Sequence, residues 1–112
     1  MKIKKLKENV CIIPARGGSK RIPFKNIKQF CGKPIIYYSI NKAIKSKLFD
    51  QVIVSTENKK IAKIAKNYGA NVHYRSAKLA NDITDTSTVI RSVIKDLDKK
   101  NFFYKKICCI YP

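Results

Sequence analysis

The sequence VCIIPARGGSKRIPFKN (residues 10–26) joins a short apolar run to a long polar segment that is rich in glycine and basic residues. Residues 10–13 are apolar without interruption, which is typical of a strand buried on both faces of a parallel sheet. Pro14 ends this strand, and the glycines and prolines of residues 15–33 predict a long loop instead of a regular element. Loops of this length in compact domains are usually functional.

Downstream of this loop, helical and strand-like patterns alternate. Apolar residues at helical spacing or in short runs predict helices over residues 34–46, 61–68 and 86–97 and strands over residues 52–55, 71–74 and 106–110. Pro34 suits a first helical turn, Gly69 suits a helix C-cap, and Asp85 or Thr86 suits the N-cap of the third helix. The alternation predicts one α/β domain over residues 1–112, with a mostly parallel sheet, helices on both faces and right-handed crossovers.

The last predicted strand, residues 106–110, is followed almost directly by Pro112. In a doubly wound sheet this strand would present an open edge, which native proteins normally cover or shorten. We therefore expect the 112 residues to be the N-terminal part of a longer domain, with a sheet that is incomplete at the C-terminus.

The net charge is +18, with 25 Lys and Arg residues against 7 Asp and Glu residues. Such an excess resembles the electrostatic footprint of a nucleic-acid-binding protein. The lysines, however, are spread over every predicted helix and loop, and they come with many Ile and Asn residues. This distribution favours a general compositional bias of the surface over a dedicated nucleic-acid surface, and a highly negative small substrate is compatible with both.

Membrane association and secretion are not indicated. The longest apolar runs are only a few residues, far below the length that crosses a bilayer. The basic start, MKIKKLKENV, is not followed by an apolar stretch or a small-residue cleavage site. We expect a cytoplasmic protein without a membrane partner.

The residues that usually bind metals form no constellation in the sequence. Cys11, Cys31, Cys108 and Cys109 lack CxxC spacing and His73 is the only histidine, so no zinc site can be assembled. We expect reduced, buried thiols, because three of the four cysteines lie in apolar runs. None of the seven carboxylates forms a convincing pair near the loop of residues 15–33, which we call the glycine loop.

Asp82 and Asp85 are the carboxylates nearest to the expected loop side, and a solvated or capping role is favoured for both. The sequence therefore assigns no metal ligand.

The glycine loop has the chemistry of a phosphate site. Gly17 and Gly18 allow a tight backbone turn with N–H groups close to phosphate oxygens, and Ser19 adds a donor. Four cations lie within ten residues: Arg16, Lys20, Arg21 and Lys25. Like charges in contact cost about 1 to 4 kcal/mol per pair, depending on screening, and a triphosphate would remove this cost. Neither the P-loop string nor the dinucleotide fingerprint occurs, so another nucleotide-binding class is indicated.

Three segments together resemble a known family. They are IIPARGGSKRIPFKNIKQFCGKPIIYYSI (12–40), FDQVIVSTENKKIAKIAKNYGA (49–70) and VHYRSAKLANDITDTS (72–87). Their order and spacing resemble the acylneuraminate cytidylyltransferases from about residue 10 to the end of the chain. Within that family, GGSKRIP followed by FCGKPII is most similar to the pseudaminic acid cytidylyltransferases. The resemblance implies the Rossmann-like, three-layer fold of nucleotide-diphospho-sugar transferases.

The resemblance also implies a reaction, in which CTP and a nonulosonic acid give the CMP-sugar and pyrophosphate with Mg²⁺ as cofactor. The sugar hydroxyl attacks the α-phosphorus in line with the departing pyrophosphate. The family's metal ligands and most of its sugar pocket are expected beyond residue 112, and a homodimer is possible for the intact protein.

Carried over residue by residue, the resemblance gives roles to positions in three segments. Matches to triphosphate contacts are Arg16, Ser19, Lys20 and Lys25, alongside Gly17 and Gly18, and Asn26 matches a contact near the nucleotide. Arg16 and Lys20 are expected to stabilise charge on the leaving pyrophosphate. Arg75 and Thr86 match positions around the cytidine, although Ser76 replaces the family's common proline and Thr86 replaces its frequent serine.

Three alternatives stay open. The substrate can instead be N-acetylneuraminic or legionaminic acid, since these enzymes share the features up to Asn26. The chain can be a basic nucleic-acid-binding module, which would bind duplex DNA or RNA tightly and with strong salt dependence. The 112 residues can also be catalytically inactive by themselves.

Overall fold

The computed structural model describes residues 5–18, 24–76, 86–100 and 102–112, and the side chains of 5–7 are excluded from this description. The strands are β1 (Lys5–Pro14), β2 (Gln29–Phe30), β3 (Lys33–Pro34), β4 (Gln51–Thr56), β5 (Asn71–Tyr74) and β6 (Phe102–Cys109). The helices are α1 (Ile35–Ser46), α2 (Lys59–Asn67), α3 (Thr86–Lys99) and the short 3₁₀ helix η1 (Lys25–Ile27).

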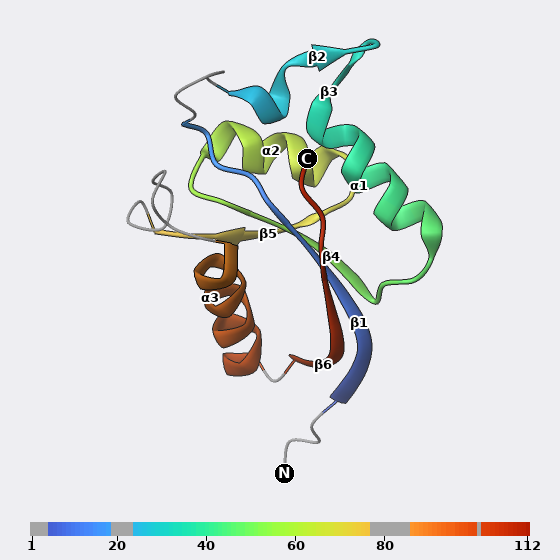
Figure 1. Ribbon diagram of the computed structural model, residues 1–112, viewed down its shortest axis with the longest axis vertical. Helices are drawn as coiled ribbons and strands as arrows, with labels where there is room; N and C mark the ends of the chain where they lie inside the picture. The colour runs from blue at the N-terminus through green and yellow to red at the C-terminus, as the bar shows by residue number, and fades with distance from the viewer. Residues whose placement is uncertain (1–4, 19–23, 77–85, 101) are drawn as a thin grey trace.

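The main sheet is parallel, with strand order β5-β4-β1-β6 (Figure 1). Strand β1 lies inside the sheet, where Val10 pairs with both Gln51 of β4 and Ile107 of β6. The apolar residues 10–13 are completely buried, which confirms the strand predicted for them. The predicted mostly parallel α/β fold is confirmed.

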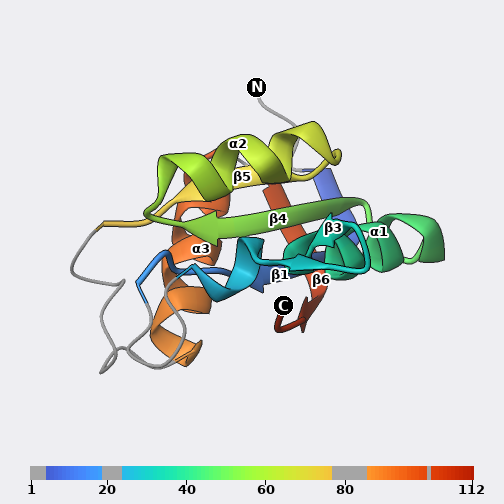
Figure 2. The same ribbon diagram turned by 90° about the horizontal axis from the view of Figure 1, so that it is seen from above.

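Helices cover both faces of the sheet. Helices α1 and α2 pack on one face, with Ile36, Ile40 and Ile61 fully buried against Ile13. Helix α3 packs on the other face through Val93 and Leu97, and Figure 1 shows it across the sheet from α1 and α2. Seen from above in Figure 2, α2 lies along β4 and β5. The two cores give the three layers that the sequence predicted.

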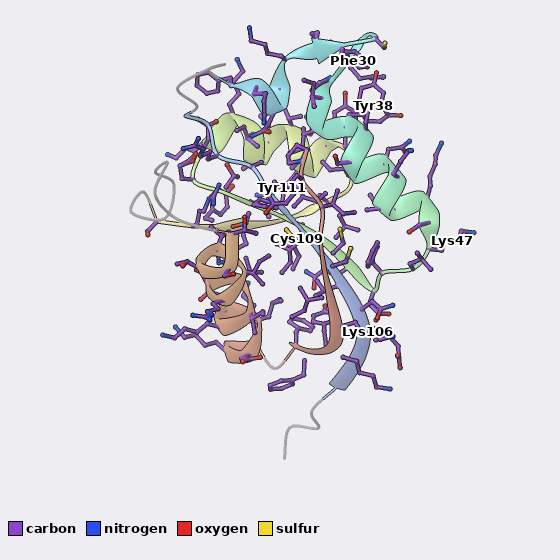
Figure 3. The ribbon with its side chains drawn as sticks, viewed as in Figure 1. Phe30, Tyr38, Lys47, Lys106, Cys109 and Tyr111 are labelled. Atoms are coloured by element: carbon purple, nitrogen blue, oxygen red, sulfur yellow. The ribbon has the colours of Figure 1, made fainter. Side chains whose placement is uncertain are left out.

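Residues 24–34 contain short regular elements where the sequence predicted a continuous loop. Helix η1 is followed by an antiparallel hairpin of β2 and β3. Cys31 and Gly32, with φ of 50° and 83°, form its turn, and Tyr38 Oη on α1 lies 2.5 Å from the carbonyl oxygen of Phe30. Phe30 and Tyr38 also meet edge to face, with ring centroids 5.9 Å apart (Figure 3). Two-residue strands are too short to show a period in sequence, so the prediction missed them.

Both ends of α2 are capped, and the sequence predicted the C-terminal cap. The Asn58 side chain accepts hydrogen bonds from the backbone N–H groups of Lys60 and Ile61 at the N-terminus. Gly69 follows the helix with φ of 96°, the left-handed conformation that glycine adopts after a helix. Helix α3 begins at Thr86, and the alternative cap Asp85 lies outside the described residues. No helix among the described residues is long and apolar enough to span a bilayer.

The expectation that the cysteines are buried is wrong for two of them. Cys11 on the central strand is buried, Cys109 is half-buried, and Cys31 and Cys108 are exposed. Cys31 lies in the hairpin turn, and Cys108 lies on β6 at an edge of the sheet. An apolar run therefore did not imply burial on an edge strand. All four thiols are free.

A series of hydrogen bonds between side chains connects α3 to the sheet. Ser55 Oγ lies 3.0 Å from His73 Nδ1, and His73 Nε2 lies 2.5 Å from Asp96 Oδ2. With a proton on Nε2, the ring donates to Asp96 and accepts from the Ser55 hydroxyl. Ser55 is completely buried, so its hydroxyl group cannot form hydrogen bonds with water. His73 supplies the hydrogen-bond partner in place of water.

We predict that Asp96→Asn lowers the free energy of unfolding by about 1 kcal/mol, and that His73→Ala lowers it by about 2 kcal/mol because it leaves the Ser55 hydroxyl buried without this partner. Asp98→Asn, the same change at an exposed position of α3, is the matched control and should alter stability very little. Urea unfolding followed by circular dichroism measures all three. Equal stability of the Asp96 and Asp98 variants would contradict a stabilising role for the hydrogen bond between His73 and Asp96.

A second prediction concerns thiol reactivity. Burial, with a smaller contribution from Cys108 and Cys109, raises the pKa of Cys11 to about 12, so at pH 8 its thiol stays protonated and unreactive. Burial also raises the pKa of Cys109. Cys31 and Cys108 should therefore react rapidly with an aromatic disulfide reagent at pH 8, Cys109 more slowly, and Cys11 only after denaturation. Mass spectrometry of the labelled peptides checks this order, and rapid labelling of Cys11 in the native chain would contradict it.

Candidate functional site

The carboxyl ends of β1, β4 and β5 are held level with one another. The backbone N–H of Ala15 donates to Ser55 O at 2.9 Å, and that of Arg75 donates to Thr56 O at 3.1 Å. Arg16, Glu57 and Arg75 thus follow directly at the same edge of the sheet, on the side where α2 begins (left in Figure 1). The strand order reverses between β1 and β6, and ligands of open α/β sheets bind at such a switch point. The segment that follows β1 borders it.

The base of the glycine loop is closed by two hydrogen bonds. The N–H of Phe24 donates to Gly17 O at 3.2 Å, and Asn26 Nδ2 donates to Arg16 O at 3.0 Å. Asn26 is only 6% exposed, so its amide is a fixed part of this base. Asn26 was predicted to contact the nucleotide, and the contact it makes in the structure positions the backbone of Arg16.

The two glycines differ in what requires them. A Cβ on Gly17 would lie 2.8 Å from Nδ2 and 3.1 Å from Cβ of Asn58, so a larger residue would collide with the cap of α2. A Cβ on Gly18 would meet nothing within 4 Å. Neither glycine is among the residues with positive φ. A left-handed conformation is therefore not what selects glycine here, and close approach of the loop to α2 is the requirement at Gly17.

Glu57 is the functional candidate that sequence reasoning missed. The backbone N–H of Gly17 donates to Glu57 Oε1, and Oε2 of the same carboxylate lies 3.3 Å from that nitrogen. The signal available in the sequence was its position directly after the buried strand β4, at the same edge as the glycine loop. Considered as one of seven scattered carboxylates, Glu57 formed no pair and was given no role.

Arg75 is a buried cation in the same cluster. The residue is only 8% exposed to solvent. Burial lowers the pKa of Arg75, the Glu57 carboxylate opposes this shift, and the Arg16 guanidinium adds to it. Arginine stays protonated in proteins, so the two arginines and one carboxylate that follow β1, β4 and β5 at this edge carry an excess positive charge.

Thr86 belongs to a second group of contacts. Its hydroxyl lies 2.5 Å from the Tyr111 hydroxyl, and Ser39 Oγ on α1 donates to Tyr111 O at 3.4 Å. Figure 3 shows Tyr111 beyond the end of β6, where the N–H of Ile110 donates to Ile12 O at 3.0 Å. These contacts join the start of α3 to the end of β6. Thr86 was predicted to lie near the cytidine, and Tyr111 is the neighbour that the sequence did not reveal.

The structure thus gathers four of the predicted residues, Arg16, Gly17, Asn26 and Arg75, around one loop base. Gly18 and Lys25 are exposed next to it. Ser19, Lys20 and Arg21 lie outside the described residues, as do Asp82 and Asp85. Among the described residues, no three His, Cys, Asp or Glu side chains group to hold a metal ion.

The cluster is suited to bind an anion. The Gly17 N–H donates to the Glu57 carboxylate, and Arg16 and Arg75 lie at the same edge of the sheet. A backbone N–H and guanidinium groups can equally serve a phosphate oxygen. The Ser55–His73–Asp96 chain does not add a nucleophile, because the Ser55 side chain is completely buried and no substrate can reach it.

Comparisons with known proteins identify the family. Residues 10–111 match the family described as Cytidylyltransferase. A pseudaminic acid cytidylyltransferase of Campylobacter jejuni is 45% identical over 105 residues, which cover 93% of this chain and 45% of that relative. A CMP-N,N'-diacetyllegionaminic acid synthase of Legionella pneumophila is 42% identical over 107 residues, which cover 92% of this chain and 45% of that relative. The chain spans about half the length of these curated relatives.

A solved structure supports the fold. CMP:2-keto-3-deoxy-manno-octonic acid synthetase in complex with CTP superposes with a TM-score of 0.67 at 21% identity, covering 89% of this chain and 40% of that one. At this identity the likeness establishes the fold alone. The match over residues 10–111, together with relatives above 40% identity, shows that the chain belongs to the cytidylyltransferase family.

Proposed function

We propose that this chain is the N-terminal, nucleotide-binding part of an enzyme that transfers CMP from CTP to a nonulosonic acid and releases pyrophosphate. The observation that carries the proposal is the meeting of Arg16, Gly17 and Arg75 at the carboxyl edge of the sheet. The names of the relatives support CTP and a nine-carbon acidic sugar as substrates. Pseudaminic acid is favoured, since a relative with that activity in its name shares 45% identity.

The protein's part in such a transfer is positioning and neutralisation of charge. Arg16 would meet the triphosphate directly after β1, where Asn26 holds its carbonyl oxygen. Arg75 is set by its backbone bond to β4 and would meet the nucleotide from the neighbouring strand. Lys20 is proposed to stabilise the departing pyrophosphate together with Arg16, and Thr86 to contact the cytidine.

The remaining partners follow from the same chemistry. Mg²⁺ would neutralise phosphate charge, and its protein ligands are proposed to come from outside the 112 residues. We propose a cytoplasmic location for the enzyme. The sugar site and a homodimer are likewise proposed for the longer protein.

The alternative of a nucleic-acid-binding module differs in its competition behaviour. Binding of RNA that free CTP does not displace would favour it, whereas weak binding that modest salt abolishes would favour the enzyme.

Arg75→Gln should weaken CTP binding by about 10- to 100-fold, the amount expected when one charge-assisted hydrogen bond to phosphate or base is lost. Arg91→Gln removes the same group from an exposed position of α3 and should bind CTP normally. Isothermal titration calorimetry measures the affinities, and circular dichroism verifies that both variants are folded. Arg75→Lys should fall between them, and an unchanged CTP affinity in Arg75→Gln would remove Arg75 from the site.

Lys20→Ala should lower turnover by about 100-fold or more in a chain extended to the length of its relatives, by analogy with the loss of one preorganised donor. The readout is pyrophosphate release from CTP in the presence of pseudaminic, legionaminic or N-acetylneuraminic acid. Lys47→Ala, which removes an exposed lysine at the far end of α1 (Figure 3), is the control. Near-normal turnover of the Lys20 variant would refute its role, and the preferred sugar identifies the substrate.

A further inference from the structure

The anion-binding position of the glycine loop is filled by a carboxylate of the chain itself. Both oxygens of Glu57 face the backbone nitrogen of Gly17, and Gly17 is buried. Glu57 is brought there by two fixed neighbours. On one side it follows β4, and on the other it precedes Asn58, whose side chain caps α2 and packs against Gly17.

The surroundings of this carboxylate are those of a phosphate. Arg16, Glu57 and Arg75 follow β1, β4 and β5 at the same edge of the sheet. The pKa of Arg75 accordingly responds to both neighbours: Glu57 raises it and Arg16 lowers it. Without an anion, these two cations would repel each other in a partly buried place. A carboxylate among them offsets that repulsion and satisfies the Gly17 N–H at the same time.

A phosphate and the carboxylate cannot both accept from this one N–H, and their negative charges would repel at contact distance. A polyphosphate that takes the Gly17 N–H would therefore have to displace Glu57 from it.

We propose that Glu57 is an internal stand-in for phosphate, which occupies the Gly17 N–H and offsets the positive charge of Arg75 in the ligand-free protein and is displaced when the triphosphate binds. The inference rests on the proposed function for the identity of the natural ligand, but only on the described contacts for the exchange of anions. The proposed role of Glu57 differs from a purely structural role in one respect. A structural hydrogen bond would only stabilise the fold, whereas a stand-in also competes with the ligand.

Glu57→Gln separates these roles, because the amide oxygen can still accept from Gly17 while the charge is gone. Glu8→Gln is the matched control: it makes the same change in side chain and net charge at an exposed residue that pairs with Lys105. Inorganic tripolyphosphate is the probe, titrated calorimetrically into the 112-residue chain in the presence of EDTA, so that metal bridging between two anions does not contribute. Thermal unfolding is followed with and without the same probe.

We expect Glu57→Gln to bind tripolyphosphate about tenfold more tightly than the parent chain, since one contact repulsion is removed. Without the probe its melting temperature should be lower than that of the parent, and saturating tripolyphosphate should restore it. Glu8→Gln should match the parent in both measurements. Unchanged or weaker binding by Glu57→Gln, or a melting temperature that the probe does not restore, would overturn the proposal.

The same titration with CTP and ATP keeps the two proposals apart. Tighter tripolyphosphate binding without a preference for CTP over ATP would support the exchange at Glu57 and count against the cytidylyltransferase function. A CTP preference in both chains, without tighter binding by Glu57→Gln, would do the reverse.

Discussion

The parallel pairing of β1 with β4 is the constraint on which the rest of the structure depends. Its last bond, from Ala15 N to Ser55 O, fixes where β1 ends, and the bond from Arg75 N to Thr56 O fixes β5 against the same strand. A slip of one residue would turn every side chain of β1 to the opposite face. It would also move Arg16 and Gly17 away from Glu57. The register that builds the core thus also assembles the anion site.

Much of this fold follows from sequence because its signals are local. Residues 10–13 form an unbroken apolar run, and α3 buries an apolar stripe with helical period; both elements were predicted. The hairpin and the exposed Cys108 were not, because a two-residue strand has no period and the exposure of an edge strand depends on its neighbours. Arg16 and Arg75 were placed at one site by resemblance. Glu57 was missed because its meeting with Gly17 spans 40 positions, and only the sheet register brings them together.

Glycine at position 17 shows how packing and chemistry share one residue. The absence of a side chain lets the loop approach Asn58 closely, and the same approach aims the Gly17 N–H at Glu57. Asn58 at once caps α2 and forms the wall against which the loop rests. A larger residue at position 17 would therefore displace the loop, the helix cap and the carboxylate together.

The electrostatics of the site explain why a buried arginine is tolerated beside another. Desolvation disfavours the charged form of Arg75, and Arg16 adds to that cost, while Glu57 opposes both. A buried charge normally requires a partner of opposite sign with good geometry. In the ligand-free chain that partner is part of the protein, and any ligand that replaces it must bring at least as much negative charge to the same place. A polyphosphate carries several negative charges and exceeds this requirement, whereas a single carboxylate only equals it, so the charge arrangement at this edge favours a polyphosphate over a monoanion.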